Sequence, residues 1–343
     1  MKLGVIFGSS STEHEVSVVS GYNVISNLDK KKYEVIPIYL DKNNNWYTCE
    51  NFQIEKFGEL PKKTKPIKNV FEFLKKLDCV FPVMHGKMGE DGSIQGFLEV
   101  LGIPYVGCNI LASSVCMDKI YTKAILKNIA NVSPDVTIIK ENKDLYYYDD
   151  LKLVKKVNIK DIDKLINEKL NYPVFIKPSR FGSSVGVTKV KNGKSLKRAL
   201  LEALKYDNEV LIEKEIKGRE LECAVLCGKS LEVGEVLSAE EFYDYDAKYQ
   251  NEESKTVIPA NIPKEIKNNI KDIAQLSFRA TNCKGLARVD FFLENKTNKI
   301  IINEINTMPG FTDISMYPKL AEAAGISYKK LLDILIKDAL KNK

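Results

Sequence analysis

The first forty residues constrain the fold of this chain more than any other feature. A short apolar run from Leu3 to Phe7 is followed by the turn Gly8-Ser9-Ser10-Ser11. Apolar residues then recur at helical spacing from Val18 to Leu28, and a second apolar run extends from Tyr33 to Tyr39. A strand, a helix and a strand in this order join parallel strands. The sequence therefore predicts a doubly wound parallel sheet at the N-terminus.

Apolar periodicity along the rest of the chain predicts a mixture of strands and helices. Strands are expected at 79–84, 173–177, 210–213, 220–227, 231–237, 285–293 and 299–305, and helices at 93–101, 117–130, 263–281, 317–324 and 327–340. Boundaries near 107 and 212 divide the 343 residues into units at 1–107, 108–212 and 213–343. The polar, lysine-rich region 140–169 has no clear pattern.

Composition excludes several classes of protein. Lys and Arg exceed Asp and Glu by 52 − 46 = 6, and the lysines are scattered, so no nucleic-acid partner is expected, although the charge suits an anionic small substrate. No apolar stretch approaches the ~20 residues of a membrane span. The seven cysteines include no C-x-x-C, which indicates reduced thiols and a cytoplasmic protein. Cys223 and Cys227, in an apolar stretch, are expected to be buried.

One pair of strands could carry a metal site. Residues two apart in a strand share a face, so Arg288 and Asp290 point one way, and so do Glu304 and Asn306. A hairpin that turns at 295–298 would place Asp290 opposite Glu304. Mg²⁺ prefers such oxygen ligands together with phosphates, and arginine suits developing negative charge. A solvent-facing hairpin with ordinary polar residues is the alternative.

Two loops could bind charged ligands. The segment from Ile176 to Gly186 combines Lys177 with small residues whose amides can contact phosphate, although it lacks the P-loop order and could be a plain turn. Near the N-terminus, Thr12 and Glu15 form a capping-box pattern. Glu13 has no such structural role and could receive an ammonium group at the end of the strand. No dinucleotide-binding glycine pattern is present.

Two further features are less specific. Residues 241–249 alternate aromatic and charged side chains, as a flap over a site does, although a surface loop has a similar composition. His14 and His85 are the only histidines and lie far apart in sequence, so a histidine metal site is disfavoured and hydrogen-bonding roles are expected.

Taken in order, these segments resemble the D-alanine–D-alanine ligases of the ATP-grasp superfamily over nearly the whole chain. The segments that carry the resemblance are 11–17, 85–92 with Gln95-Gly96, 117–119, 177–186, 242–249, 288–290 and 304–312. The resemblance implies an α/β and α+β chain, in which the N-terminal sheet precedes a two-subdomain ATP-grasp fold. It also implies a homodimer, two Mg²⁺ ions for which Mn²⁺ can substitute, and D-alanine and ATP as substrates.

The resemblance also assigns roles to residues. The nucleotide-binding positions would be Lys119, Lys177 and Ser184 at the phosphates, with Glu213, Lys214, Ile216 and Glu220 around the adenosine. The metal ligands would be Asp290, Glu304 and Asn306. Glu13 would hold the ammonium group of the first D-alanine, Arg288 and the backbone near Gly310 the reaction intermediates, and Ser315 and Met316 the second D-alanine's carboxylate. Ser183 and Tyr249, with Glu13, would link the active site to the flap, which also contains Lys248.

In this family the first D-alanine is phosphorylated by ATP, and the second attacks the acyl phosphate. The flap at 242–249 would then exclude water, which otherwise hydrolyses that intermediate. Two positions depart from the family pattern: Ser9 replaces a common glycine, and Met316 replaces a usual leucine. The apolar Met316 favours D-alanine, but 86–92 and 303–312 also resemble D-alanine–D-serine ligases.

Two different classes of protein compete with the ligase. A nicotinamide-dependent oxidoreductase would share the strand-helix-strand opening, but the missing glycine pattern disfavours it. An inactive binding protein could keep the fold, but the presence of Arg288 with Asp290, Glu304 and Asn306 argues against it. Binding of NAD, or binding of MgATP without turnover, would distinguish these two classes from the ligase.

Overall fold

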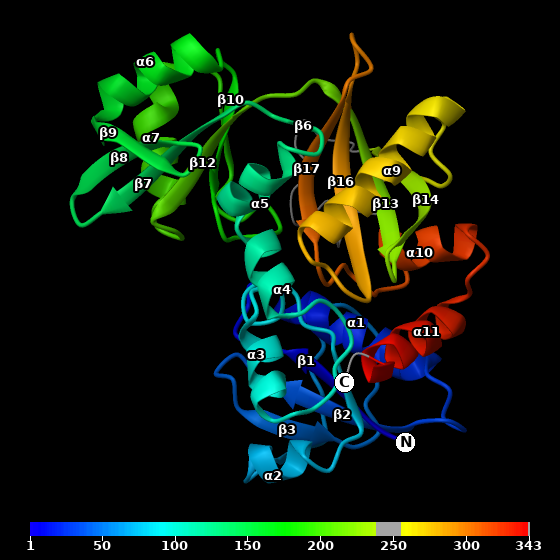
Figure 1. The fold of residues 1–343 in the computed structure, drawn as a ribbon. Helices are drawn as coiled ribbons and strands as arrows, with labels where there is room; N and C mark the ends of the chain where they lie inside the picture. Colours follow the sequence, from blue (N-terminus) through cyan, green and yellow to red (C-terminus); the bar gives the residue numbers. More distant parts are fainter. Residues whose placement is uncertain (238–254, 342–343) are drawn as a thin grey trace.

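The computed structural model describes residues 1–237 and 255–341, which form three sheets with helices packed against them (Figure 1). The order of strands and helices follows the predicted mixture of α/β and α+β structure. Within these residues no helix is long and apolar enough to cross a membrane. The three sheets surround the region where the pockets described below are found.

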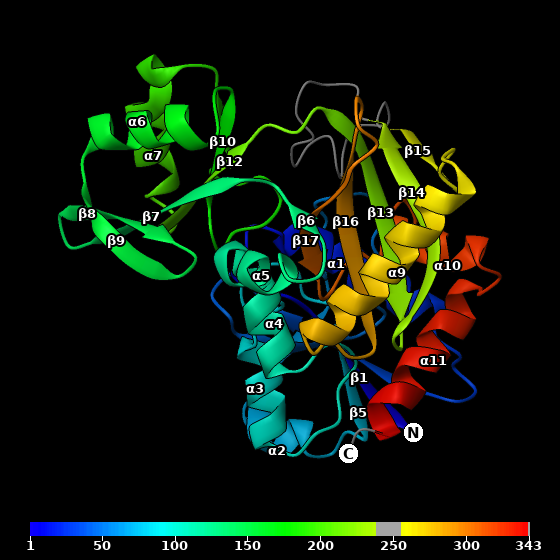
Figure 2. The same cartoon turned by 45° about the horizontal axis from the view of Figure 1, so that its top comes forward.

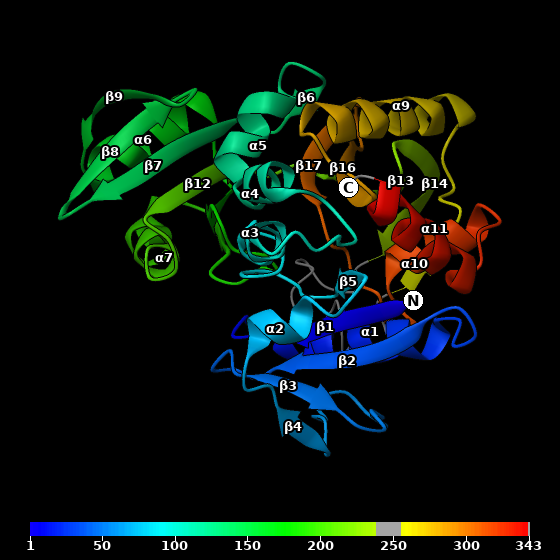
Figure 3. The ribbon, with the colours of Figure 1, turned by 60° about the horizontal axis from the view of Figure 1, so that its bottom comes forward.

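The N-terminal sheet has the strand order β4-β3-β2-β1-β5. Its strands are β1 (Lys2–Gly8), β2 (Glu34–Leu40), β3 (Trp46–Cys49), β4 (Thr64–Pro66) and β5 (Cys79–Pro82). β1 pairs in parallel with β2 and β5, which confirms the predicted parallel core. β3 and β4, which the sequence did not predict, extend the sheet in antiparallel fashion and form its edge (Figure 3).

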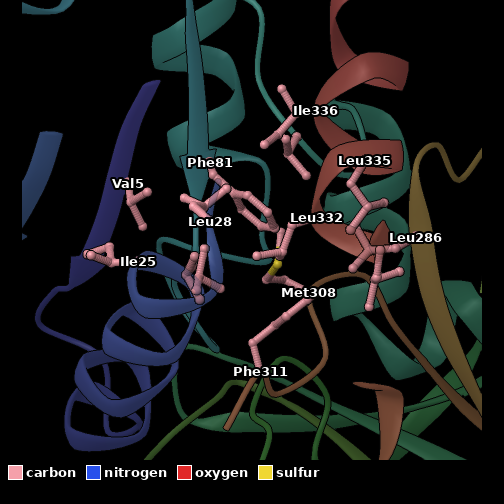
Figure 4. Packing of buried hydrophobic residues seen from close by; sticks show 14 of the residues in the cluster. Val5, Ile25, Leu28, Phe81, Leu286, Met308, Phe311, Leu332, Leu335 and Ile336 are labelled. Atoms are coloured by element: carbon pink, nitrogen blue, oxygen red, sulfur yellow. The ribbon is translucent and has the colours of Figure 1, made fainter. Parts of the chain in front are cut away.

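Alternate residues of β1 enter different cores, as the two-residue period of a strand requires. Leu3, Val5 and Phe7 pack with α1 (His14–Asn27) and with the C-terminal helix α11 (Tyr328–Lys341). Ile6 faces the opposite core with α2 (Val70–Leu74) and α3 (Ser93–Val100). Figure 4 shows the core that β1 shares with α1 and α11, with Val5 and Ile25 on one side and Leu335 and Ile336 on the other. The C-terminal helix thus completes the core of the N-terminal sheet.

The middle sheet is antiparallel, with the strand order β11-β10-β12-β7-β8-β9. Its strands are β7 (Asp135–Glu141), β8 (Asp144–Asp149), β9 (Lys152–Val157), β10 (Val174–Pro178), β11 (Thr188–Val190) and β12 (Glu209–Lys214). The helices α6 (Ile159–Lys169) and α7 (Leu196–Ala203) bury their apolar residues against this sheet. The lysine-rich region without a clear pattern is therefore the hairpin β8–β9 followed by α6.

The C-terminal sheet has the strand order β15-β14-β13-β16-β17-β6. Its strands are β6 (Asn131–Val132), β13 (Gly218–Leu226), β14 (Lys229–Leu237), β15 (Lys255–Val257), β16 (Leu286–Glu294) and β17 (Ile300–Asn306). The long helix α9 (Lys264–Ala280) crosses this sheet (Figure 2), and α10 (Met316–Ala323) contacts β13 and β14. β16 and β17 pair with Asp290 opposite Glu304, as predicted.

Two short helices connect the N-terminal sheet to the other two. The sequence predicted one helix over 117–130, but the structure has α4 (Ile110–Met117) and α5 (Lys119–Leu126). Asp118 separates them, because its extended backbone ends α4 and its carboxylate accepts the N–H groups of Ile120 and Tyr121 at the start of α5.

Two local predictions need correction, and the departure from the family pattern at Ser9 has a local consequence. Thr12 and Glu15 form no capping box, because α1 begins at His14 with Glu13 at its N-cap, and Glu15 pairs instead with Lys42 at 2.6 Å. Cys223 is buried as expected, but Cys227 is exposed. Ser9 has a backbone φ of 100°, so its replacement of a glycine matters locally. This φ value lies in a region that residues other than glycine rarely adopt.

Candidate active site

An inner pocket lies where the loops of the N-terminal sheet meet the C-terminal sheet. It encloses a volume of about 110 Å³ and is predominantly polar. The predicted site residues that line it are Glu13, Lys119, Ser183, Arg288, Glu304, Asn306, Gly310 and Ser315. The fold thus gathers positions from five separate segments of the chain around one cavity.

An outer pocket of about 570 Å³ lies between the middle and C-terminal sheets, a size within the usual range for small-molecule sites. The predicted residues that line it are Lys119, Lys177, Ser183, Ser184, Glu213, Lys214, Ile216, Glu220 and Glu304. Lys119, Ser183 and Glu304 line both pockets, so the two cavities adjoin one another.

The side chains of Glu13 and Ser183 join the N-terminal loop to the glycine-rich loop after β10. The hydroxyl of Ser183 donates to Oε1 of Glu13 over 2.5 Å, across 170 residues of sequence. Ser183 and Ser184 have φ values of 47° and 61°, so this loop holds two successive serines in the left-handed region. Such strain persists where the surrounding structure enforces it, often at functional sites. Glu13 is buried, with one oxygen in this contact.

The β16–β17 hairpin brings charged side chains together at the floor of the inner pocket. Arg288 donates to both oxygens of Asp290 over 2.7 Å, and its Nε lies 2.9 Å from Oε2 of Glu222. The amide nitrogen of Asn306 donates to Asp290 over 2.9 Å, which directs the amide oxygen away from Asp290. The planar guanidinium is thus held in a fixed orientation beside a set of oxygen ligands.

Lys119 begins α5 and reaches the glycine-rich loop. Its Nζ donates to the carbonyl oxygen of Phe181 over 2.7 Å. Burial lowers the pKa of Lys119, and Glu304 is the main group that opposes this shift. Asp118, at the N-cap of the helix, also accepts the hydroxyl of Ser179 over 2.6 Å. These contacts fix a cation where the two pockets adjoin.

Lys177 on β10 points into the outer pocket beside Glu213 on the neighbouring strand β12. Its Nζ lies 2.6 Å from Oε2 of Glu213. Burial lowers the pKa of Lys177, but Glu213 outweighs this effect and the net shift is upward. Lys177 is therefore a cation that an anionic ligand can approach from the pocket.

Three polar residues organise the loop before α10, and the sequence singled out only His85 among them, for which it predicted a hydrogen-bonding role. Glu90 accepts the N–H groups of Gly86 and Met308 over 2.7 and 3.1 Å. His85 lies 3.0 Å from the carbonyl oxygen of Met308 and 2.9 Å from the hydroxyl of Ser20. Glu90 and His85 lie in the segment 85–92, which carries part of the family resemblance. Nothing in the local sequence of Ser20 distinguished it from other helical serines.

The loop that follows β17 ends at the N-terminus of α10. Ser315 is the N-cap of this helix, and its hydroxyl lies 2.7 Å from that of Thr312. The N–H groups of a first helical turn and the helix dipole favour an anion. Gly310 lies close to Ser315, because a Cβ atom at position 310 would approach the Ser315 hydroxyl to 2.6 Å.

Several residues could hold a cation, although the described residues contain no group of three His, Cys, Asp or Glu side chains arranged for a metal ion. The predicted set combines two carboxylates, Asp290 and Glu304, with the amide of Asn306. Oxygen ligands of this kind suit Mg²⁺, particularly when phosphate oxygens complete its coordination. The predicted flap, with Lys248 and Tyr249, lies outside the described residues.

Comparisons with known proteins show similarity over most of the chain. The family model described as "D-ala D-ala ligase N-terminus" matches residues 2–108, and that described as "D-ala D-ala ligase C-terminus" matches 147–337. The D-alanine–D-alanine ligase of Clostridium acetobutylicum is 46% identical, and the alignment covers 98% of this chain and 96% of that protein.

Solved structures show the same similarity. The D-alanine–D-alanine ligase of Bacillus anthracis complexed with ATP is 33% identical, with a TM-score of 0.76 and coverage of 100% of this chain and 98% of that one. The VanG D-Ala:D-Ser ligase of Enterococcus faecalis is 36% identical, with a TM-score of 0.83 and coverage of 98% and 99%.

Proposed function

The chain belongs to the D-alanine–D-alanine ligase family, and we propose that it joins its two amino acids in the inner pocket while ATP occupies the outer pocket. It is an ATP-dependent ligase that forms D-alanyl-D-alanine for peptidoglycan synthesis. The observation that carries the assignment of the pockets is that Lys119, Ser183 and Glu304 line both of them. A phosphate group bound there would reach both cavities.

The inner pocket offers partners to one charged group of each of the two amino acids. Glu13 would bind the ammonium group of the first D-alanine, because its buried carboxylate is fixed by Ser183. The N-terminus of α10 at Ser315 would bind the carboxylate of the second. Arg288 lines the same cavity. The charged groups of the pocket would therefore orient the two amino acids, although the volume that the pocket encloses is small.

The outer pocket offers cations to the phosphates and a mixed surface to the adenosine. Lys119, Lys177 and Ser184 would bind the phosphates. Lys214, at the end of β12, and Ile216, on the segment that connects the two sheets, would lie near the adenine. Glu213 and Glu220 supply acceptors for the base and ribose. The adenine edge has an acceptor at N7 beside a donor at the 6-amino group. Glu213 presents an acceptor to that amino group.

The chemistry follows from these positions. The carboxylate of the first D-alanine attacks the γ-phosphorus of ATP, ADP leaves, and an acyl phosphate forms. The amine of the second D-alanine attacks the acyl carbon, and Arg288 with the backbone amides near Gly310 stabilises the oxyanion. Phosphate then leaves with its electron pair and takes up the proton that the nitrogen releases, and the amide remains. Lys119 and Lys177 contribute by holding the phosphates in line for the first step.

Asp290, Glu304 and Asn306 would hold two Mg²⁺ ions, for which Mn²⁺ can substitute. Their oxygen atoms share one face of the β16–β17 hairpin, and the Asn306 amide oxygen is directed away from Asp290. When bound, these ions would neutralise charge on the phosphates of ATP. The arrangement thus fits the hard cations that accompany nucleotides.

Other assignments extend the proposal. Residues 1–107, 108–212 and 213–343 would form the substrate-binding unit and the two halves of the ATP-grasp fold. Lys248 and Tyr249 would cover the site as part of a flap that excludes water from the acyl phosphate. The enzyme would act in the cytoplasm as a homodimer.

D-alanine is favoured over D-serine as the second substrate, because the full-length curated relatives are D-alanine–D-alanine ligases. Met316 lines the inner pocket beside Ser315 and offers an apolar surface to a methyl group. A hydroxymethyl side chain would leave its hydroxyl without a partner at that surface.

Phosphate release with MgATP tests the function. The reaction is followed with D-alanine alone, with D-alanine plus D-serine, and with D-alanine plus D-lactate, and the products are identified by mass. D-alanyl-D-alanine from D-alanine alone supports the proposal. Preferential formation of D-alanyl-D-serine would assign the chain to the D-serine ligases, and no turnover with any mixture would contradict ligase function.

A further inference from the structure

A lysine that does not line either pocket organises the outer one. Lys123 lies on α5 and is 6% exposed. Its Nζ is 2.6 Å from Oε1 of Glu213, 2.7 Å from the carbonyl oxygen of Ser133 and 3.1 Å from Oδ1 of Asp135. An ammonium group has three N–H donors, so these three oxygens can satisfy it completely. Lys123 therefore has no donor left for a ligand.

Glu213 is held from both sides by lysines. Lys123 contacts its Oε1 atom and Lys177 contacts its Oε2 atom, each over 2.6 Å. The hydroxyl of Ser133 also lies 3.0 Å from Oε1. Burial opposes ionisation of Glu213, but the two lysines together outweigh it and lower its pKa below the usual range. The carboxylate is therefore fixed, ionised and able only to accept hydrogen bonds.

The helix α5 sets the spacing of this arrangement. Lys119 and Lys123 are four residues apart, so they lie on the same face of the helix, one turn apart. Lys119 reaches the glycine-rich loop at Phe181, whereas Lys123 reaches the carboxylate at Glu213. One rigid helical turn thus fixes the distance between the phosphate end of the outer pocket, near Lys119, and the Glu213 carboxylate that would face the base.

We infer that Lys123 is a positioning residue for selection of the nucleotide base, because it fixes the Glu213 carboxylate beside Lys177 as an acceptor for the 6-amino group of adenine. The inference rests on the proposed placement of ATP in the outer pocket. A 6-oxo purine presents an acceptor where adenine presents a donor. Its oxygen would face the ionised carboxylate, so a fixed Glu213 disfavours that base. A mobile or protonated Glu213 would tolerate it.

The alternative is that Lys123 only neutralises buried carboxylates, and base selectivity separates the two roles. The experiment compares Lys123→Met, Glu213→Gln and the double variant with the wild-type enzyme. Lys127→Met serves as the control, because Lys127 is the C-cap residue of the same helix and its side chain is exposed. Binding of MgATP and MgITP is measured by calorimetry without D-alanine, and kcat and KM are measured with saturating D-alanine.

We expect Lys123→Met to weaken MgATP binding and to reduce the preference for ATP over ITP, each by about tenfold, because the site loses a hydrogen-bonding requirement. The KM for D-alanine should stay unchanged, and Lys127→Met should resemble the wild type. In the Glu213→Gln background, Lys123→Met should change the preference for ATP over ITP by less than about twofold, because Lys123 acts through the Glu213 carboxylate that is already absent.

A Lys123→Met enzyme that keeps the full preference for ATP over ITP would overturn the inference. The inference would also fail if Lys123→Met reduced this preference as strongly in the Glu213→Gln background as in the wild type. If Lys123→Met does not fold, the double variant removes both charges of the pair. That variant should fold and should share the reduced preference of Glu213→Gln. Since the binding assay needs no ligation, an inactive wild-type enzyme would count against the proposed function and leave this test intact.

Discussion

The Nδ1 atom of His85 lies 3.0 Å from the carbonyl oxygen of Met308, although the two residues are 223 positions apart. A carbonyl only accepts hydrogen bonds, so Nδ1 carries the proton and Nε2 of the neutral ring is an acceptor. The Ser20 hydroxyl, 2.9 Å from Nε2, donates to it and accepts the N–H of Phe311 over 3.2 Å. This chain of hydrogen bonds ties the N-terminal unit to the loop that contains Gly310.

Replacement of Ser20 by alanine tests this connection. The N–H of Phe311 and the Nε2 of His85 both lose a partner in a buried site, which should cost about 1–3 kcal/mol of stability. The loop at Gly310 should also lose its fixed position, so kcat/KM for D-alanine should fall about tenfold. Ser277→Ala is the matched control, because the buried Ser277 hydroxyl has no hydrogen-bond partner within the described residues. A stability loss with unchanged kcat/KM would refute the positioning role.

The same histidine predicts a dependence of stability on pH. Burial lowers the pKa of His85 below its ordinary value of 6.5, Arg288 reinforces the shift, and Glu13 opposes it. Below about pH 6.5 the unfolded chain therefore binds a proton that the folded chain does not. The stability contributed by neutral His85 is complete above that pH and is lost as the pH falls.

We expect the free energy of unfolding of the wild type to fall relative to that of His85→Asn by at most about 2 kcal/mol between pH 7 and pH 5. Asparagine keeps a donor toward Met308 but does not titrate. Urea unfolding at several pH values measures the difference, and parallel curves for the two proteins would show that His85 does not contribute.

Gly86 and Gly102 form a matched pair for the packing around Glu13. Both have positive φ values, 68° and 67°, so alanine should strain both backbones by about 1 kcal/mol. A Cβ atom at 86 would lie 2.5 Å from Oε2 of Glu13, whereas a Cβ at 102 would meet nothing within 4 Å. Gly86→Ala should therefore raise the KM for the first D-alanine strongly, and Gly102→Ala should not. Equal kinetics for the two variants would contradict the placement of Glu13.

Arg288→Lys tests the guanidinium itself. Lysine keeps the charge but cannot make the bidentate contact with Asp290 together with the contact to Glu222. We expect kcat to fall about 10²–10³-fold, as for the loss of one oxyanion donor. The KM for ATP should change little. A lysine variant that retains most of its kcat would assign Arg288 a structural role.

Glu304→Gln tests the metal assignment. The substitution removes a negative charge that faces both pockets but keeps the shape of the side chain. Nearly all activity should be lost while the melting temperature stays close to that of the wild type, because Mg²⁺ prefers carboxylate over amide ligands. Glu265→Gln on α9 provides the control at a surface position. Retention of more than about 5% of kcat would refute the role of Glu304 as a metal ligand.

Much of the local structure could be predicted because it depends on residues close together in sequence. The continuous apolar run of β1 and the apolar period of α9 indicated these two elements. The turn at 295–298 and the pairing of Asp290 with Glu304 were predicted, although the final register also depends on an irregularity between Asp290 and Phe291 that shifts the pairing by one residue. The resemblance to a known family then related the separate segments to one another.

Other features depended on contacts between distant parts of the chain. Asp118 caps α5 locally, but its carboxylate is also fixed by the hydroxyl of Ser179, which directly follows β10 and lies 61 residues away in sequence. The positive φ of Ser9 is likewise not visible in its local sequence.

The periodicity of the chain predicted the strands that carry the site, such as β1, β16 and β17, because it depends on side chains a few residues apart, but it left β3, β4 and α4 unpredicted. Only the tertiary structure placed Lys123 against Glu213 and His85 against Met308, across 90 and 223 residues. Buried polar groups must find partners wherever the fold brings them, and no local pattern specifies which distant residue that partner will be.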